Sequence, residues 1–151
     1  MRQESSRHSQ LIREFIKRRF NKDYLKLSEN EKIQFLKKQI ISKKNQIKKF
    51  QFKNKENKEV WSTFKILANE PSECLGAYVI SMTTSASDIL SVSFLQKEAN
   101  IKNKLRVVPL FETLDDLINS KEIMEKLFSQ SWYRKMINND QEVMIGYSDS
   151  S

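Results

Sequence analysis

The sequence contains little of what disulfide-bonded, turn-rich or membrane-spanning proteins need. Its 151 residues include one cysteine, two glycines and two prolines. A single cysteine excludes an internal disulfide and a zinc finger, and so few turn-forming residues argue against a β-sandwich. No apolar run reaches the roughly 18 residues that a bilayer-spanning helix requires. We therefore expect one domain without a membrane segment, in a reducing compartment such as the cytoplasm.

The charge is distributed unevenly along the chain. Residues 1–58 hold 18 Lys or Arg against 6 Asp or Glu, whereas residues 59–151 hold 9 against 13. The basic part, densest over Lys37–Lys58, is typical of a module that binds nucleic acid or an anionic surface. However, 20 of the basic residues are Lys and only 7 are Arg, and Arg is the residue that direct phosphate or base readout favours. We therefore interpret this stretch as a solvated surface and keep the binding module as the alternative.

The first half of the sequence has helical spacing. Apolar residues recur at helical intervals over residues 9–20, and the spacing of Ser28 and Glu31 predicts a capping box that opens a second helix. From Lys43 to Lys58 the apolar pattern gives way to Lys, Asn and Gln, which predicts a solvated loop or an exposed helix end. A third helix is expected over Glu59–Asn69, because apolar residues return there at helical spacing.

In the second half, short apolar runs alternate with helical patterns. The runs predicted to be strands are Ala77–Met82, Arg106–Phe111 and Val143–Tyr147. The helices predicted between them are Ser87–Ala99, one capped by Thr113, one capped by Ser120 that continues to Phe128, and Trp132–Asn138. This alternation indicates βα units built on a parallel sheet.

Two carboxylates follow strands of this predicted sheet. Glu112 comes after the second apolar run and Asp149 after the third. Because parallel strands end at the same edge of a sheet, both side chains are expected there, and two carboxylates suit a hard cation such as Mg²⁺ or Mn²⁺. Judged by spacing alone, the commoner interpretation is that they are helix caps or loop carboxylates.

Several stretches of the sequence occur in the order of the motifs of one family. They are Arg2–Ser5 with Arg7 and His8, Ala77–Met82, Ser87–Leu90, Val107–Leu117, Trp132–Arg134 and Val143–Ser150. Together they resemble the phosphoenolpyruvate carboxylase family. The clear matches cover residues 2–8 and 77–150, whereas residues 9–75 fit only as a helical pattern, with a Lys-rich stretch unlike typical members.

The resemblance implies an architecture. Members of the family are mostly helical tetramers with a central (β/α)₈ barrel, so we expect an α/β fold that is an internal piece of this TIM-type barrel. Residues 1–8 would be the end of a truncated first barrel strand and the following loop. Residues 9–75 would be a helical insertion with the Lys-rich segment, and residues 76–151 would be βα units that supply three more strands and the metal-site residues.

The resemblance also implies an activity and site residues. Family members carboxylate phosphoenolpyruvate with bicarbonate to give oxaloacetate and phosphate, a carbon-fixing step that feeds the tricarboxylic acid cycle, and they use Mg²⁺ or Mn²⁺. By motif match, Glu112 and Asp149 would be the metal ligands. Arg2 would face the substrate phosphate or the developing oxyanion, although a salt bridge at the barrel rim is its structural alternative. Leu110 and Met144 would form the apolar wall near the substrate, or simply pack inside the barrel.

Three segments that the family uses are expected to be missing from this chain. They are the segment with the catalytic histidine, which His8 does not replace, the lysine that closely follows the Tyr-Ser-Asp-Ser motif, and a mobile glycine-rich loop. We therefore expect the isolated chain to be inactive. The resemblance further implies a cytoplasmic homotetramer in the full-length family, with no membrane partner and no nucleic-acid partner.

Overall fold

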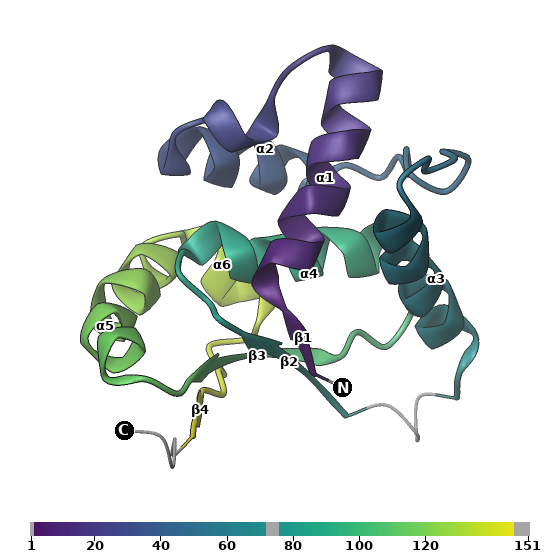
Figure 1. The fold of residues 1–151 in the computed structure, drawn as a ribbon. Coiled ribbons are helices and arrows are strands. Elements are labelled where there is room, and N and C mark those ends of the chain that lie inside the picture. The colour runs from purple at the N-terminus through teal and green to yellow at the C-terminus, as the bar shows by residue number, and fades with distance from the viewer. Residues whose placement is uncertain (1, 72–75, 147–151) are drawn as a thin grey trace.

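The structure, a computed structural model, describes residues 2–71 and 76–146. Over these residues, one or more helices connect each strand to the next (Figure 1). The strands are β1 (Arg2–Glu4), β2 (Ala77–Ser81), β3 (Arg106–Phe111) and β4 (Met144–Ile145). The helices are α1 (Ser5–Phe20), the 3-10 helix η1 (Tyr24–Lys26), α2 (Glu29–Ile41), α3 (Lys55–Asn69), α4 (Ala86–Glu98), α5 (Leu114–Phe128) and α6 (Ser131–Met136). The predicted mixed α/β class, with more helix than strand, is confirmed.

The described strands form one parallel sheet in the order β1-β2-β3-β4. The register places Arg2 beside Val79, Val79 beside Val108, and Leu110 beside Met144. Neighbours in parallel register point to the same face, so these side chains share one face of the sheet. The parallel sheet predicted from the alternation is confirmed, and all strands end at the same edge.

The two faces of the sheet are covered differently. The helices pack on one face, and in Figure 1 no described helix lies below the sheet. The helix-covered face contributes Tyr78, Ile80 and Phe111 to the main core, which also contains wholly buried residues of α1, α3 and α4. On the opposite face Val79, Val108 and Leu110 form a small separate cluster. Because α1 and α3 share the main core with the βα units, the helical stretch and the sheet fold as one body.

Two of the predicted helix caps are confirmed and one is wrong. Ser28 and Thr113 each form a capping box, in which the hydroxyl accepts from the third helical N–H and the acidic residue there accepts in return. Ser120 does not begin a helix, because α5 is continuous from Leu114 to Phe128. Its hydroxyl donates to the carbonyl of Leu117 within the same helix at 2.7 Å, so the serine is accommodated without ending the helix.

The Lys-rich stretch is less solvated than predicted. Ile47 is fully buried and Phe52 is 4% exposed, although the lysines between them are exposed. Helix α3 begins at Lys55 rather than near Glu59, because the side chain of Asn54 accepts from the backbone N–H of Asn57 at 3.1 Å and caps it. The sequence analysis missed these two buried residues, because isolated apolar residues among lysines give no hydropathy pattern.

The remaining boundaries differ little from prediction. Residues 5–8, expected to be a loop after the first strand, form the start of α1. The third apolar run gives only the two-residue strand β4, and Tyr147 lies outside the described residues. None of the helices in the described part of the chain is long and apolar enough to cross a membrane.

Candidate active site at the carboxyl edge of the sheet

Two residues predicted from the family motifs, Arg2 and Glu112, meet at the carboxyl edge of the sheet. Arg2 lies in β1 and Glu112 directly follows β3, so their side chains reach each other across β2. Arg2 Nη2 donates to Glu112 Oε1 at 2.7 Å. The side chains are 58% and 34% exposed, so both remain accessible to a ligand. An ion pair this exposed contributes little to stability, which leaves both groups free to serve another role.

Hydrogen bonds of the local backbone fix the position of the Glu112 main chain, from which its side chain extends. Glu112 stands between the end of β3 and Thr113, the N-cap of α5. Its backbone N–H donates to Asp116 Oδ2 at 3.1 Å, and the same oxygen accepts from the N–H of Thr113 at 3.2 Å. Asp116 thereby links the strand end to the first turn of α5, where a negative charge is also favourable.

Gly146 leaves room for the Glu112 side chain. Its N–H donates to the carbonyl of Phe111 at 3.1 Å, which carries the chain past the end of β3. A Cβ at this position would lie 3.2 Å from Glu112 Cγ and 3.6 Å from Leu110 Cδ1. A side chain here would therefore push against the carboxylate, and glycine explains how β4 approaches so closely.

The two apolar residues predicted to line the substrate pocket are neighbours on one face. Leu110 and Met144 are partners in the β3–β4 register. Leu110 is 3% exposed in the small cluster of the open face, whereas Met144 is 44% exposed. The structure brings both toward the side on which Arg2 lies, and their role as a substrate wall stays a prediction.

The predicted metal site is described only in part. Asp149 lies outside the described residues. Within residues 2–71 and 76–146, no group of three or more His, Cys, Asp or Glu side chains is arranged to hold a metal ion. Glu112 by itself fits a hard cation, because it presents an exposed carboxylate whose Oε2 has no hydrogen-bond partner among the described side chains, while Oε1 is occupied by Arg2.

His8 lies on the other side of the sheet from these residues. It is fully buried in α1, and its Nε2 is 2.7 Å from the hydroxyl of Tyr78, a residue of the main core. Burial, assisted by the positive charge of Arg7, lowers the pKa of His8 from 6.5 to about 4. The imidazole is therefore neutral at pH 7 and packs in the core. That His8 does not replace the catalytic histidine stays a prediction.

One feature of this edge was missed from the sequence. Met82, directly after β2, has a left-handed backbone with φ of 56°, and its side chain is 60% exposed. Its carbonyl accepts from the hydroxyl of Ser5 at 2.8 Å, which ties the carboxyl ends of β1 and β2 together. Methionine carries no signal for this conformation, which is uncommon outside Gly, Asn and Asp, so only the structure reveals it.

Comparison with known proteins places these observations in a family. A family model described as phosphoenolpyruvate carboxylase matches residues 1–151. A phosphoenolpyruvate carboxylase of Aliivibrio salmonicida is 48% identical over 151 residues, which are 100% of this chain and 17% of that protein. A C4 phosphoenolpyruvate carboxylase of Flaveria trinervia is 46% identical over 150 residues, 99% of this chain and 16% of that protein. The chain thus spans about a sixth of the length of the curated relatives it matches.

Proposed function

The chain belongs to the phosphoenolpyruvate carboxylase family, and on that premise we propose that it forms part of an enzyme that makes oxaloacetate and phosphate from phosphoenolpyruvate and bicarbonate. The observation that carries the proposal is the match over residues 1–151 at 48% identity to a protein of that name. The convergence of Arg2 and Glu112 supports it, because the family motifs assign both residues to one site.

The sheet is proposed to be part of a (β/α)₈ barrel. Its strands are parallel and in sequential order, and helices cover only one face, as they do in such barrels. The opposite face, with Val79, Val108 and Leu110, would then point into the barrel. Active sites of these barrels lie at the carboxyl ends of the strands, and this is where Glu112 and Gly146 are found.

The cofactor is proposed to be Mg²⁺ or Mn²⁺, with Glu112 and Asp149 as its protein ligands. The cation would supply a positive charge for the enolate oxygen that forms when the phosphoryl group leaves phosphoenolpyruvate. Arg2 would bind the substrate phosphate or the same oxyanion, since its guanidinium stays charged and can donate two parallel hydrogen bonds. Its ion pair with Glu112 supports this role, because it brings the guanidinium beside the proposed metal ligand. Leu110 and Met144 would pack against the apolar methylene of the substrate.

Assembly and location follow from the same premise. We propose that the complete enzyme is a cytoplasmic homotetramer, as the family resemblance implies. The alternative, a separate basic binding module at Lys37–Lys58, is less favoured, because Ile47 and Phe52 tie this stretch into the same core as the sheet. The 151 residues alone are expected not to turn over substrate, since they correspond to about a sixth of an enzyme of this family.

The test is a chimera in which residues 1–151 replace the homologous segment of the full-length Aliivibrio salmonicida relative. We expect it to form oxaloacetate from phosphoenolpyruvate and bicarbonate, measured by coupling to a malate dehydrogenase. Glu112→Gln and Asp149→Asn should each lower kcat/KM by on the order of 100-fold or more, because each removes a ligand charge at the developing oxyanion. Both should also weaken Mn²⁺ binding, measured by electron paramagnetic resonance.

The matched control is Glu125→Gln, which removes an exposed carboxylate on α5 away from the strand ends. It should leave both kcat/KM and Mn²⁺ affinity unchanged. A chimera that assembles as the parent does but makes no oxaloacetate would contradict the proposed activity. Full activity of the Glu112→Gln chimera would show that Glu112 is not a metal ligand, and it would not affect the family assignment.

A further inference from the structure

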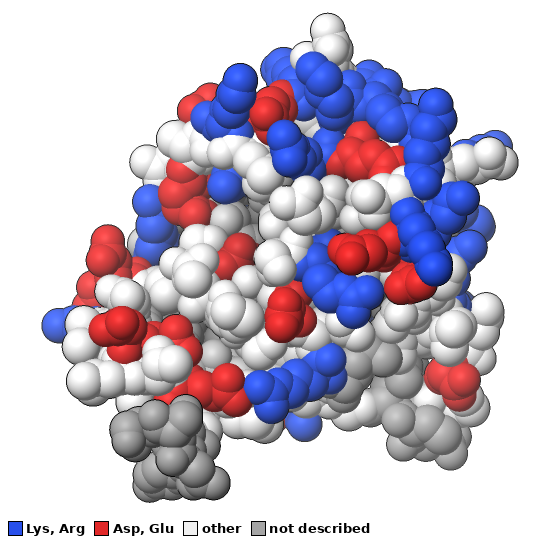
Figure 2. Space-filling model, viewed as in Figure 1, with Lys and Arg blue, Asp and Glu red and all other residues white. Residues whose placement is uncertain are grey.

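The Lys-rich stretch and α3 border an open pocket that the proposed reaction does not use. The pocket has a volume of about 480 Å³. Four lysines stand around it, Lys48 and Lys49 from the loop and Lys58 and Lys65 from α3, and no Asp or Glu lines it. In Figure 2 basic side chains gather over this part of the molecule, at the upper right. We call this hollow the lysine pocket.

The ammonium groups of the lysine pocket are not neutralised within the described residues. All four lysines are exposed, and none of them forms an ion pair with a described carboxylate. Charges of one sign held around one hollow repel each other. An anion bound in the hollow would therefore meet positive charge that no described carboxylate cancels.

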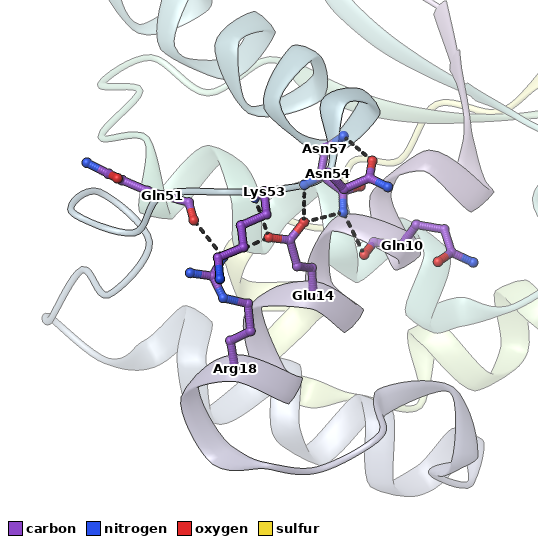
Figure 3. Close-up of polar contacts among 7 residues, drawn as sticks. All are labelled: Gln10, Glu14, Arg18, Gln51, Lys53, Asn54 and Asn57. Atoms are coloured by element: carbon purple, nitrogen blue, oxygen red, sulfur yellow. Dashed lines mark hydrogen bonds and ion pairs between the residues drawn. The ribbon is translucent and has the colours of Figure 1, made fainter.

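A carboxylate anchors the end of the loop that precedes α3. Figure 3 shows Glu14 of α1 surrounded by hydrogen-bond donors from the end of the loop and the start of α3. It accepts from the backbone N–H groups of Lys53 at 2.8 Å and Asn54 at 3.1 Å, and from Asn57 Nδ2 and Arg18 Nη1 at 2.9 Å each. Burial alone would raise the pKa of Glu14, but these hydrogen bonds outweigh it and lower the pKa below its usual value. Glu14 is therefore a charged carboxylate, and each of its two oxygens accepts two hydrogen bonds.

A second carboxylate anchors the other end of the loop. Glu98 of α4 is fully buried, and its two oxygens accept from the backbone N–H of Gln46 at 3.0 and 3.3 Å. Between the two anchors, the side chains of Ile47 and Phe52 turn into the core. The loop that carries Lys48 and Lys49 thus has a fixed shape, with both ends tied to helices.

We propose that the lysine pocket binds a small anion with a chain of phosphate groups, of the triphosphate type. Its volume lies in the range of small-molecule sites, and a hollow suits a compact ligand better than a flat membrane or a duplex. Lysines bind phosphate as point charges and without the fixed fork of Arg, so the site recognises charge rather than shape.

The aromatic residues at the pocket argue against recognition of nucleic-acid bases. Three aromatic residues line the pocket. Phe52 and Trp61 are each only 4% exposed, and Phe50 is half-buried, with the guanidinium carbon of Arg18 4.4 Å from its ring centroid. The ring of Phe52 packs on both of the others, with its centroid 6.3 Å from that of Trp61 and 4.9 Å from that of Phe50. Single-stranded nucleic acid is usually held by bases stacked on exposed rings, and none of these three rings is an exposed residue. The site is independent of the proposed carboxylase function and lies on the helical side of the molecule.

The test measures binding of inorganic tripolyphosphate to the 151-residue chain by calorimetry, and to the full-length chimera as a second host. The pocket variant carries Lys48→Gln, Lys49→Gln, Lys58→Gln and Lys65→Gln. The control variant carries Lys104→Gln, Lys121→Gln, Lys126→Gln and Lys135→Gln, which changes the net charge equally. We expect saturable binding that weakens about tenfold or more in the pocket variant and much less in the control. It should also weaken at about 0.3 M salt.

A nucleoside triphosphate and a single-stranded oligonucleotide form the other arms of the test. Because the rings are covered, the nucleoside should add no affinity beyond that of tripolyphosphate. Equal losses in both variants would mean that only net charge matters and would overturn the proposal, as would the absence of saturable binding in both hosts. An oligonucleotide or nucleotide that binds more than about tenfold tighter than tripolyphosphate would also overturn it, in favour of a nucleic-acid or nucleotide site.

Discussion

The sheet-bearing part of the molecule and its basic loop are held in shape in different ways. Residues 76–146 derive their shape from apolar side chains on both faces of β2 and β3, a pattern that is visible in the sequence. The loop before α3 contributes only a few apolar side chains, and its ends are fixed by Glu14 and Glu98 through backbone N–H groups. The shape of one region is thus specified by hydrophobic periodicity. The shape of the other is specified by two carboxylates on helices that lie far from the loop in the sequence.

The largest expected effect concerns the core that both regions share. Phe64 of α3 is fully buried and stacks on Tyr78 of β2, with ring centroids 5.4 Å apart. Phe64→Ala should lower the free energy of unfolding by about 4 kcal/mol, because it leaves a cavity between α3 and the sheet. Ile66→Ala, on the same helix at a side chain 60% exposed, should cost less than about 0.5 kcal/mol. Urea unfolding of both variants checks this, and equal losses would show that α3 does not depend on the sheet.

The next effect is a pH dependence of the free energy of unfolding, caused by His8, which joins α1 to the sheet through Tyr78. The pKa of His8 is 6.5 when unfolded and about 4 when folded. The stability from its neutral form is therefore complete above pH 6.5 and is lost as the pH falls toward 4. Between pH 7 and pH 4.5 this loss should be about 2.5 kcal/mol.

His8→Gln tests this assignment, because the amide can still reach Tyr78 but does not titrate. The variant should lose about 2.5 kcal/mol less than the parent between the same two pH values, measured by urea unfolding, whatever its stability at pH 7. The carboxylates are the same in both proteins, so their contribution cancels. Parallel pH profiles for the two proteins would refute the buried, neutral state of His8.

A smaller effect distinguishes the loop from the sheet. Glu14→Gln replaces one acceptor oxygen by a donor that faces other donors, so it should cost about 2 kcal/mol. It should also speed amide hydrogen exchange in residues 51–57, while exchange in β2 and β3 stays unchanged. Glu125→Gln, at an exposed ion pair 3.9 Å long, should change neither quantity. Uniformly faster exchange over the whole chain would contradict a local role for Glu14.

The smallest effect compares two capping boxes, one in each region. Ser28→Ala and Thr113→Ala should each cost about 1 kcal/mol, because each leaves a helical N–H without its acceptor. Only Thr113→Ala should also lower the activity of the chimera, since Thr113 adjoins Glu112 and shares Asp116 with it. Steady-state kinetics of the two chimeras, which should be similarly stable, would test this. Equal activities would show that the cap at Thr113 does not influence the site at Glu112.

The sequence predicted those parts of the fold that repeat a local pattern. The bounds of β3 and the caps at Ser28 and Thr113 follow from neighbouring residues, and they are confirmed. Ser120 misled the prediction because a serine hydroxyl can bond within its own helix as well as cap a new one. The early start of α3 was missed because its cap, Asn54, lies inside the run of lysines.

The candidate site was less accessible to pattern reasoning. Arg2 and Glu112 are 110 positions apart, and only the family motifs suggested that they act together. The left-handed backbone of Met82 has no sequence signal at all. The anchors of the basic loop were missed for a similar reason: Glu14 and Glu98 bind backbone groups, and every residue except proline offers the same N–H.

That last property has a consequence for how this segment can change over generations. Since Gln46, Lys53 and Asn54 are held by their amide protons, substitutions there leave the anchoring bonds in place unless proline is introduced. Substitutions can therefore change the exposed side chains of the loop while its backbone conformation stays the same. A lineage can in this way acquire a new surface without any change to the fold beneath it.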